Sequence, residues 1–354
     1  MAFGQTTSEN CMNVESQGLI CGLPDDIAIL CLARVPRRYH HVLRCVSRKW
    51  RNLLCSEEWH FCRRKNNLEE TWIYVVCRGN LDKYVCYVLN PDPTGRSWEL
   101  IQRIPTPCSK KYGISVESVG KKMYLLGGCS WHEVTDDVYC YDASANKWEA
   151  TSPMPTARCY AVSTSLNDKL YICGGIGPNS VYPESWDIYQ SNSKSWVSHR
   201  NPLPDYDDLK IIALDEKLYT IYSSWSDRFA GLYDPASATW QLEDNNKFAL
   251  CLCGPTVVVD GTLYMLDLTF GAKLMKWEER NEWVVIGRLS RHLMRSGCHL
   301  VAIGRNIYVI EEDFSTTVID VDEAAKDGRF LVTFSLGTKL KSEYKAISCN
   351  AITI

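Results

Sequence analysis

The 354-residue chain lacks a long apolar run. Its longest one, around residues 248–259, is interrupted by Gly254 and Pro255 and falls well short of the roughly 20 apolar residues that span a bilayer. Residues 1–17 contain neither the basic nor the apolar region of a signal peptide, and we expect a short disordered leader there. We therefore expect no association with a membrane.

The chain also lacks a Cys-x-x-Cys pair and an Asn-x-Ser/Thr sequon, although it holds 17 cysteines. Disulfide frameworks belong to short secreted chains with an even, regularly spaced set of cysteines. This odd and scattered set predicts reduced thiols that pack as small apolar residues. It favours a location in the cytoplasm, the nucleus or both.

No familiar catalytic signature is present: the sequence has no nucleophile elbow, zinc-protease helix, phosphate loop or zinc-ligand spacing. Gly174 to Gly177 is followed by Pro178 and a strand pattern rather than by a helix, which argues against phosphate binding. His132, Glu133, Asp136 and Asp137 are interpreted as a solvated loop rather than a metal site. We expect no catalytic residue, no cofactor and no metal.

Charge is nearly balanced overall, with 39 Lys and Arg against 42 Asp and Glu, but it is unevenly placed. Residues 34–65 carry ten bases against two acids, a net charge of +8. Such a segment favours an acidic partner, although basic residues on solvated helix faces are common. Nucleic acid is not expected, because no aromatic platform or nucleic-acid-binding motif accompanies the bases.

Residues 18–65 have helical patterns. A first helix begins at Leu23-Pro24-Asp25-Asp26, since Pro suits the first helical position and carboxylates favour the positive end of the dipole. Val35-Pro36 breaks it and begins a second helix, and Ser56 is a good N-cap for a third. Three helices of this size bury little apolar surface, so the segment needs a partner.

This segment resembles the F-box, through Leu23-Pro24-Asp25-Asp26-Ile27, Val35-Pro36 and Val46-Ser47-Arg48-Lys49-Trp50. Val35 departs mildly from the Leu common in that family. The resemblance implies docking on an acidic Skp-type adaptor and, through it, on a cullin and a RING subunit. The residues that it implies for adaptor binding, or for packing the supporting fold, are Leu23, Pro24, Ile27, Leu32, Val35, Pro36, Leu43, Val46 and Trp50. The alternative is a plain helical cap on the next domain.

Two aromatic markers repeat in step through the rest of the chain. Tyrosines recur every 44–48 residues, at Tyr124, Tyr171, Tyr219, Tyr264 and Tyr308. Tryptophans recur every 43–50 residues, at Trp98, Trp148, Trp196, Trp240 and Trp283. Each unit has alternating strand patterns separated by turn residues, which predicts four antiparallel strands. Such a sheet cannot bury both faces alone, so several stack radially into a propeller.

The unit resembles the kelch repeat through Gly127-Gly128, Tyr141 and Trp148, and again through the next unit. The first unit has no first strand, and the C-terminal strand 345–354 would supply it and close the ring. We therefore expect a mainly β chain in which a small three-helix F-box at 18–65 precedes a six-bladed kelch-type β-propeller at 66–354.

Residues 18–354 together resemble plant F-box/kelch-repeat proteins of the Skp-interacting-partner type. That resemblance implies a non-catalytic, substrate-recognition subunit of a Skp–cullin–F-box E3 ubiquitin ligase, whose propeller binds a protein substrate for ubiquitination. The alternative is a propeller enzyme or small-ligand binder with a helical dimerisation head.

We expect the substrate surface at one mouth of the propeller. Turns between first and second strands are short and uniform, whereas the loops at the opposite mouth vary in length, as binding loops do. These loops hold Trp131, His132, Arg158, Tyr182, Trp225, Arg228, Phe270, Arg291, His292 and Arg295. Arginines are the stronger candidates because they are hard to bury, whereas several of the aromatic residues have packing between blades as an alternative.

Overall fold

The computed structural model describes residues 18–79, 83–91, 97–101, 104–105, 107–200, 208–223, 228–243, 248, 251–278, 282–289, 297–327, 333–336 and 344–354. The chain divides into a helical unit within residues 1–70, which Ile354 joins, and a strand-rich unit at 71–353. Within the described ranges, no helix has both the length and the apolarity needed to cross a membrane.

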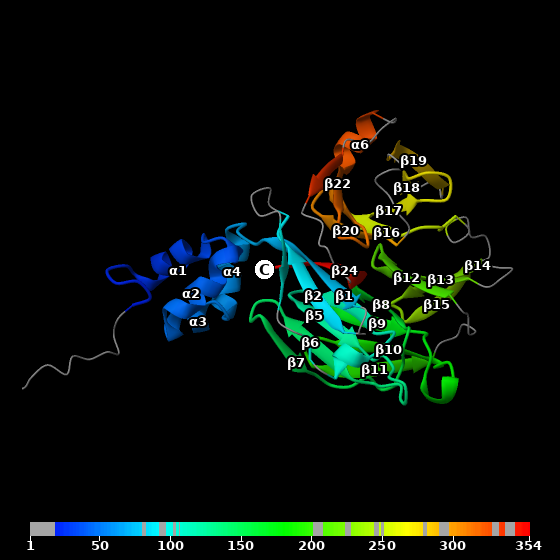
Figure 1. The fold of residues 1–354 in the computed structure, drawn as a ribbon, viewed down its shortest axis with the longest axis horizontal. Helices are drawn as coiled ribbons and strands as arrows, with labels where there is room; N and C mark the ends of the chain where they lie inside the picture. Colours follow the sequence, from blue (N-terminus) through cyan, green and yellow to red (C-terminus); the bar gives the residue numbers. More distant parts are fainter. Residues whose placement is uncertain are drawn as a thin grey trace, which may run out of the picture. The chain divides into compact units, whose positions relative to one another are not determined.

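Short helices form the first unit, and Figure 1 draws them in blue. They are α1 (Asp25–Ala33), the 3₁₀ turn η1 (Arg37–Tyr39), α2 (His40–Val46), α3 (Arg48–Leu53) and α4 (Glu57–Lys65). The expected second helix is divided at Ser47, which is extended (φ −156°, ψ 163°) and caps α3 by accepting from the Trp50 amide at 3.1 Å. Ser56 caps α4 as predicted, accepting from the Trp59 amide at 3.2 Å.

The second unit consists of six four-stranded antiparallel sheets, which confirms the predicted six-bladed propeller. Its strands are β1 (Thr71–Gly79), β2 (Tyr84–Leu89), β3 (Trp98–Leu100), β4 (Ser115–Val119), β5 (Lys122–Leu126), β6 (Val138–Asp142), β7 (Lys147–Ala150), β8 (Val162–Leu166), β9 (Lys169–Cys173), β10 (Ser185–Gln190), β11 (Ser195–Arg200), β12 (Asp208–Leu214), β13 (Lys217–Ser223), β14 (Arg228–Asp234), β15 (Thr239–Glu243), β16 (Thr256–Val259), β17 (Thr262–Asp267), β18 (Lys273–Glu278), β19 (Glu282–Arg288), β20 (His299–Ile303), β21 (Asn306–Ile310), β22 (Thr316–Asp320), β23 (Thr333–Leu336) and β24 (Tyr344–Thr353). Two 3₁₀ turns lie in loops, η2 (Cys108–Lys110) and η3 (Pro178–Ser180).

Five sheets consist of four consecutive strands, and the first does not. Its order is β24-β1-β2-β3, so the last strand of the chain lies beside the first, as Figure 1 shows with β24 in red. The pairing runs from Thr71 opposite Thr353 to Gly79 opposite Tyr344, with a shift between Val76 and Cys77. β24 therefore takes the place of the strand that the first blade lacks.

Cross-strand stacking explains the repeating aromatic residues. Tyr141 of β6 is the register partner of Trp148 on β7, and their ring centroids lie 5.1 Å apart. The same pairing joins Tyr189 to Trp196 in the next blade, at 4.9 Å. A turn between two such strands places residues seven apart opposite each other, and aromatic pairs of this kind stabilise antiparallel sheets. The spacing therefore reflects a contact that recurs in several blades, including Tyr233 with Trp240 of the fourth.

The glycine pair after the second strand is required by a close approach of the backbone. Gly127 has φ +60°, and a Cβ placed there would lie 2.2 Å from the carbonyl oxygen of Arg158. That oxygen belongs to the connection to the next blade, which also accepts a hydrogen bond from the Gly128 amide at 3.0 Å. Only glycine fits, because any side chain would push the two blades apart.

The sixth blade contains an element that the sequence analysis did not predict. Helix α6 (Val321–Asp327) lies between β22 and β23, where the second, third and fourth blades have a short turn. Asp320 begins it by accepting from the amides of Asp322 (2.9 Å) and Glu323 (3.2 Å). The helix explains why this blade lacks the usual Tyr-to-Trp spacing.

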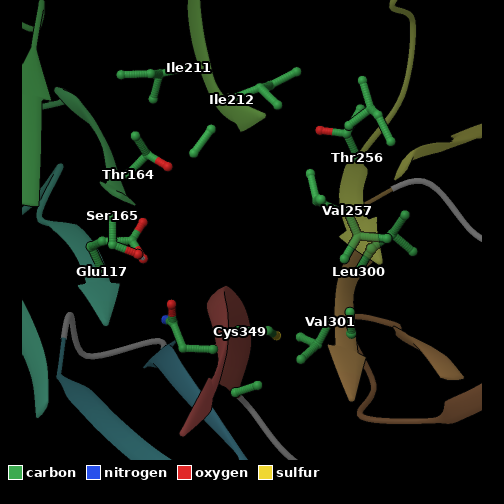
Figure 2. Close-up of a pocket in the computed structure, with 16 residues that line it drawn as sticks. Glu117, Thr164, Ser165, Ile211, Ile212, Thr256, Val257, Leu300, Val301 and Cys349 are labelled. Atoms are coloured by element: carbon green, nitrogen blue, oxygen red, sulfur yellow. Dashed lines mark hydrogen bonds between the residues drawn. The ribbon is translucent and has the colours of Figure 1, made fainter. Parts of the chain in front are cut away.

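An internal channel runs along the innermost strands β4, β8, β12, β16, β20 and β24. It has two contiguous segments of about 370 Å³ and about 400 Å³, which share Ile211, Ile212 and Thr256 as lining residues. Figure 2 shows the first of these segments. Neighbouring blades pack behind it through apolar clusters, such as the one that joins Tyr124 and Leu126 of the second blade to Leu170 and Tyr189 of the third.

Candidate functional site

The helical unit has an apolar surface outside its own core. Leu23, Ile27, Val42 and Val46 are all exposed, and Val46 reaches 57%. Beside them, Tyr39 is exposed and packs against the guanidinium of Arg38, 5.2 Å from its ring centroid. A unit of this size cannot cover all its apolar side chains, so this surface is available to a second protein.

The nine residues predicted for adaptor binding fall into two groups. Five are exposed: Leu23, Pro24, Ile27, Pro36 and Val46. The other four are partly or fully buried: Leu32, Val35, Leu43 and Trp50. Leu32, at 4% exposure, belongs to the core of the unit with Ile29, Leu53, Leu54 and Trp59. The exposed group is positioned to contact a partner, whereas the buried group supports it.

Hydrogen bonds at the start of α1 fix the position of the exposed group. The Leu19 amide donates to Asp25 Oδ1 at 2.8 Å, and the indole Nε1 of Trp50 donates to the Leu19 carbonyl at 2.7 Å. The segment before Leu23 is thereby attached to both α1 and α3. Trp50 is thus a supporting residue whose ring nitrogen holds the loop that carries Leu23 and Pro24.

A buried polar network lies behind this surface, and the sequence analysis missed it. Arg63, 1% exposed, donates through Nη1 to the Ala33 carbonyl (2.7 Å) and through Nη2 to Glu70 Oε1 (3.2 Å). Burial and the positive charge of Arg63 lower the pKa of His40 to about 3, so its neutral ring donates from Nε2 to the Val35 carbonyl (3.1 Å). Arg63 therefore joins α4 to the end of α1, and it is not one of the surface bases.

Six bases of the 34–65 segment are exposed, so the helical unit keeps a basic surface. They are Arg34, Arg48, Lys49, Arg51, Arg64 and Lys65. Arg37 is buried instead, and its amide donates to Glu70 Oε1 at 2.7 Å. The predicted preference for an acidic partner thus rests on fewer charges than the sequence count of ten.

The ten residues predicted for the substrate surface at the propeller mouth differ in their exposure. Trp131 and Phe270 are the most exposed, at 85% and 82%, and Tyr182 is 40% exposed. His132 and Arg228 are exposed as well. Arg228 donates from Nη1 to the Leu252 carbonyl at 3.3 Å. Trp225, Arg291, His292 and Arg295 lie outside the described residues.

Arg158 is the clear correction, because it is 0% exposed and not a surface residue. Its Nη2 lies 2.6 Å from Oδ2 of the equally buried Asp187, and it also donates to Ser185 Oγ at 2.9 Å. Its Nη1 donates to the Gly174 carbonyl at 3.1 Å. The expectation that an arginine stays outside fails here, because an ion pair and neutral acceptors replace its water.

Some exposed apolar residues were missed. Tyr160 and Val181 are 59% and 63% exposed on loops near the predicted set. Tyr160 is held at φ +55° by its amide, which donates to the Gly113 carbonyl at 2.7 Å. The Tyr112 ring makes an edge contact with the Trp131 ring, with centroids 5.8 Å apart. A Cβ at Gly113 would lie 2.8 Å from the Tyr160 ring, so a glycine is required there. No sequence pattern indicated that Tyr160 or Val181 would be exposed.

No group of three or more His, Cys, Asp or Glu side chains within the described ranges is arranged to hold a metal ion. In the His132 to Asp137 loop, the Asp137 carboxylate pairs with the ammonium of Lys111. The described cysteines are free thiols. Burial raises the pKa of several of them, Cys159 and Cys173 to about 12, so these thiols stay protonated at neutral pH.

Comparison with known proteins gives two family matches. The model of the F-box domain matches residues 20–61, and the model of the Kelch motif matches residues 110–155. The F-box/kelch-repeat protein SKIP4 of Arabidopsis thaliana is 39% identical over 344 residues, which cover 95% of this chain and 94% of that protein. The F-box protein AFR of the same plant is 28% identical over 290 residues, covering 75% and 76%.

Among solved structures, that of YjhT is similar, with a TM-score of 0.52 at 13% sequence identity. The match covers 73% of this chain and 97% of the YjhT chain. At this identity the likeness supports the propeller fold and nothing about activity.

Proposed function

The chain belongs to the F-box/kelch-repeat family, and we propose that it is the substrate-recognition subunit of a Skp–cullin–F-box ubiquitin ligase. The helical unit would dock on a Skp-type adaptor, and the adaptor would join it to a cullin and a RING subunit. The propeller would hold the protein substrate. No bond chemistry is assigned to the chain itself, which would act by raising the concentration of substrate lysines near the ubiquitin-loaded enzyme.

The observation that carries the proposal is the exposed apolar surface of the helical unit. Leu23, Pro24 and Ile27 lie at the start of α1, and Val42 and Val46 lie on α2. Burying an aliphatic side chain of this size contributes about 1.5–3 kcal/mol, so a few of them supply most of the affinity of a docking site. The surrounding exposed bases would speed association with an acidic adaptor.

The test is a Leu23→Ala/Pro24→Ala variant of the full chain in a pull-down with a purified Skp-type adaptor. We expect adaptor binding to fall at least about tenfold, because the variant removes contact area from the exposed surface without touching the core of the unit. Higher salt should weaken wild-type binding only in part, because apolar contact is not screened.

The matched control is Leu242→Ala, which removes an exposed leucine from the propeller; Leu242 is 64% exposed and Leu23 is 39% exposed. It should bind the adaptor as wild type does, and both variants should keep the wild-type melting temperature. Undiminished binding by the Leu23→Ala/Pro24→Ala variant would sink the proposal.

A further inference from the structure

The first segment of the propeller channel has one polar wall and one apolar wall. Figure 2 shows Glu117, Thr164 and Ser165 on one side of the cavity and Val257, Leu300 and Val301 on the opposite side. The polar wall comes from β4 and β8, and the mostly apolar wall, which also holds Thr256, comes from β16 and β20. With a volume of about 370 Å³, the cavity admits a small organic molecule.

Glu117 is the feature that requires an explanation. One oxygen of its carboxyl group, Oε1, accepts from the Ser118 amide at 2.9 Å and from Ser165 Oγ at 3.3 Å. Among the described residues no Lys, Arg or His side chain forms an ion pair with it. Burial raises its pKa to about 7, which measures how poorly the channel solvates the charged form. A carboxylate kept in such a place without a counter-charge is typical of a binding site.

Lys210 is the other charged side chain among the described residues that line the channel. It lines the second segment, together with Ser115 and Ser163, whose hydroxyl oxygens lie 2.6 Å apart. Its ammonium disfavours a second positive charge on anything that binds beside Glu117. The channel therefore fits a molecule with a single cationic group better than a diamine.

We propose that this channel binds a small primary amine, whose ammonium group pairs with Glu117 and donates to Ser165 and Thr164 while its apolar body packs on Val257, Leu300 and Val301. The two walls match the two halves of such a molecule, and the ammonium supplies the ion-pair partner that Glu117 does not find among the described residues. The inference does not depend on the proposed ligase function, since the cavity lies within the propeller.

The test uses the full chain and measures thermal shift and calorimetric binding with 2-phenylethylamine as the probe. Its neutral, anionic and dicationic comparators are 2-phenylethanol, phenylacetate and 1,5-diaminopentane. The amine should raise the melting temperature and bind at least about tenfold more tightly than each comparator, because only it offers a charge-assisted hydrogen bond together with an apolar body. Glu117→Gln should reduce amine binding about tenfold or more while leaving the response to 2-phenylethanol unchanged.

Glu149→Gln is the matched control, because Glu149 lies on β7 of the same blade and is exposed. It should bind the amine as wild type does. The proposal is overturned if the amine produces no shift in the wild-type chain, if the neutral alcohol binds equally well, or if Glu117→Gln and Glu149→Gln bind the amine alike.

Discussion

The helical unit and the propeller place the same kinds of residues in opposite environments. In the helical unit, Cys21, Cys31, Cys45 and Cys55 are exposed beside exposed Leu, Ile and Val side chains. In the propeller, Cys77, Cys86, Cys140 and Cys173 are buried between strands. The prediction that the cysteines pack as small apolar residues is therefore confirmed for these four positions of the propeller. It is wrong for the four positions of the helical unit and for Cys251 and Cys253 of the propeller, which are exposed.

Closure accounts for the difference. Each blade of the propeller packs against the next, and β24 pairs with β1, so the first blade also has four strands and the edge of β1 is covered. The helical unit has one small core around Trp59, and among its described residues Ile27 of α1 and Val42 and Val46 of α2 stay exposed outside that core. Its apolar surface is left for a partner, whereas the propeller uses its apolar residues for its own stability.

The largest effect on stability should come from removing the strand that completes the first blade. Deleting residues 345–354 removes the strand that pairs with β1, including Ile352, which is 0% exposed. Each buried aliphatic side chain contributes roughly 1.5–3 kcal/mol, so the loss should amount to several kcal/mol and lower the melting temperature of the propeller sharply. Calorimetry measures the change.

Point substitutions in the same strand serve as the control for that deletion. Ile352→Ala should reproduce part of the loss, about 2–4 kcal/mol. Thr353→Ala, at an exposed neighbouring position, should have little effect. A truncated chain that melts at the wild-type temperature would show that β24 does not stabilise the propeller.

The second effect in size concerns the buried ion pair. Arg158→Ala leaves Asp187 buried without its counter-charge, which costs about 3–5 kcal/mol and should lower the melting temperature by about 10 °C. The exposed Arg228 provides the contrast, since Arg228→Ala should change stability by less than about 1 kcal/mol. An Arg158→Leu/Asp187→Leu double variant should regain part of the loss. Equal stability of the Arg158→Ala and Arg228→Ala variants would contradict this account.

These two arginines show how far the sequence alone can go. Recurring features were predicted well, because the Tyr141–Trp148 pair and the Gly127-Gly128 pair depend on residues close in sequence and recur in the next blade. The burial of Arg158 was not predicted, because its partner Asp187 is 29 residues away and no sequence pattern near either residue indicates the ion pair. The role of Glu117 was missed for the same reason: only the closed ring creates the channel that surrounds it.

In the helical unit, too, local features were predicted and long-range contacts were not. Two of its helix starts followed from Pro24 and Ser56, since capping depends on residues within one turn, whereas the division of the second helix at Ser47 was not predicted. The burial of Arg63 depended on the Ala33 carbonyl, 30 residues away. Sequence patterns thus located the helices and their exposed apolar residues, but they could not say which bases lie outside.

A third, smaller effect is a pH dependence of stability at Glu117. Its pKa in the folded chain, about 7, lies above the ordinary value of 4.5 because of burial. The folded state therefore holds this proton more tightly than the unfolded state does, and the stabilisation present below pH 4.5 is lost as the pH rises to about 7. The side chain introduced by Glu117→Gln carries no charge at any pH. The free energy of unfolding of Glu117→Gln should therefore exceed that of wild type increasingly as the pH rises through this interval, and the difference should reach about 1–3 kcal/mol by pH 8.

Urea unfolding of both chains at pH 5 and pH 8 measures this difference. At pH 5 the two chains should differ by less than about 1 kcal/mol. Lys210 lines the adjacent segment of the channel in both chains, so it does not distinguish the two chains in these measurements. A constant difference across the pH range would mean that Glu117 ionises as an ordinary solvated carboxyl group.

The smallest effect on stability should come from the exposed aromatic residues of the propeller mouth. Trp131 and Phe270 are more than 80% exposed, so a Trp131→Ala/Phe270→Ala variant loses little buried area and should melt within about 2 °C of wild type. If the mouth resembles the helical unit in keeping apolar side chains for a partner, the same variant should lose proteins seen by proximity labelling, while its adaptor binding stays intact. The control is Leu100→Ala, at an exposed position on the outer strand β3. A labelling pattern identical to wild type in both variants would place substrate recognition away from Trp131 and Phe270. The exposed aromatic residues of the propeller would then differ from the exposed apolar residues of the helical unit in not serving a partner.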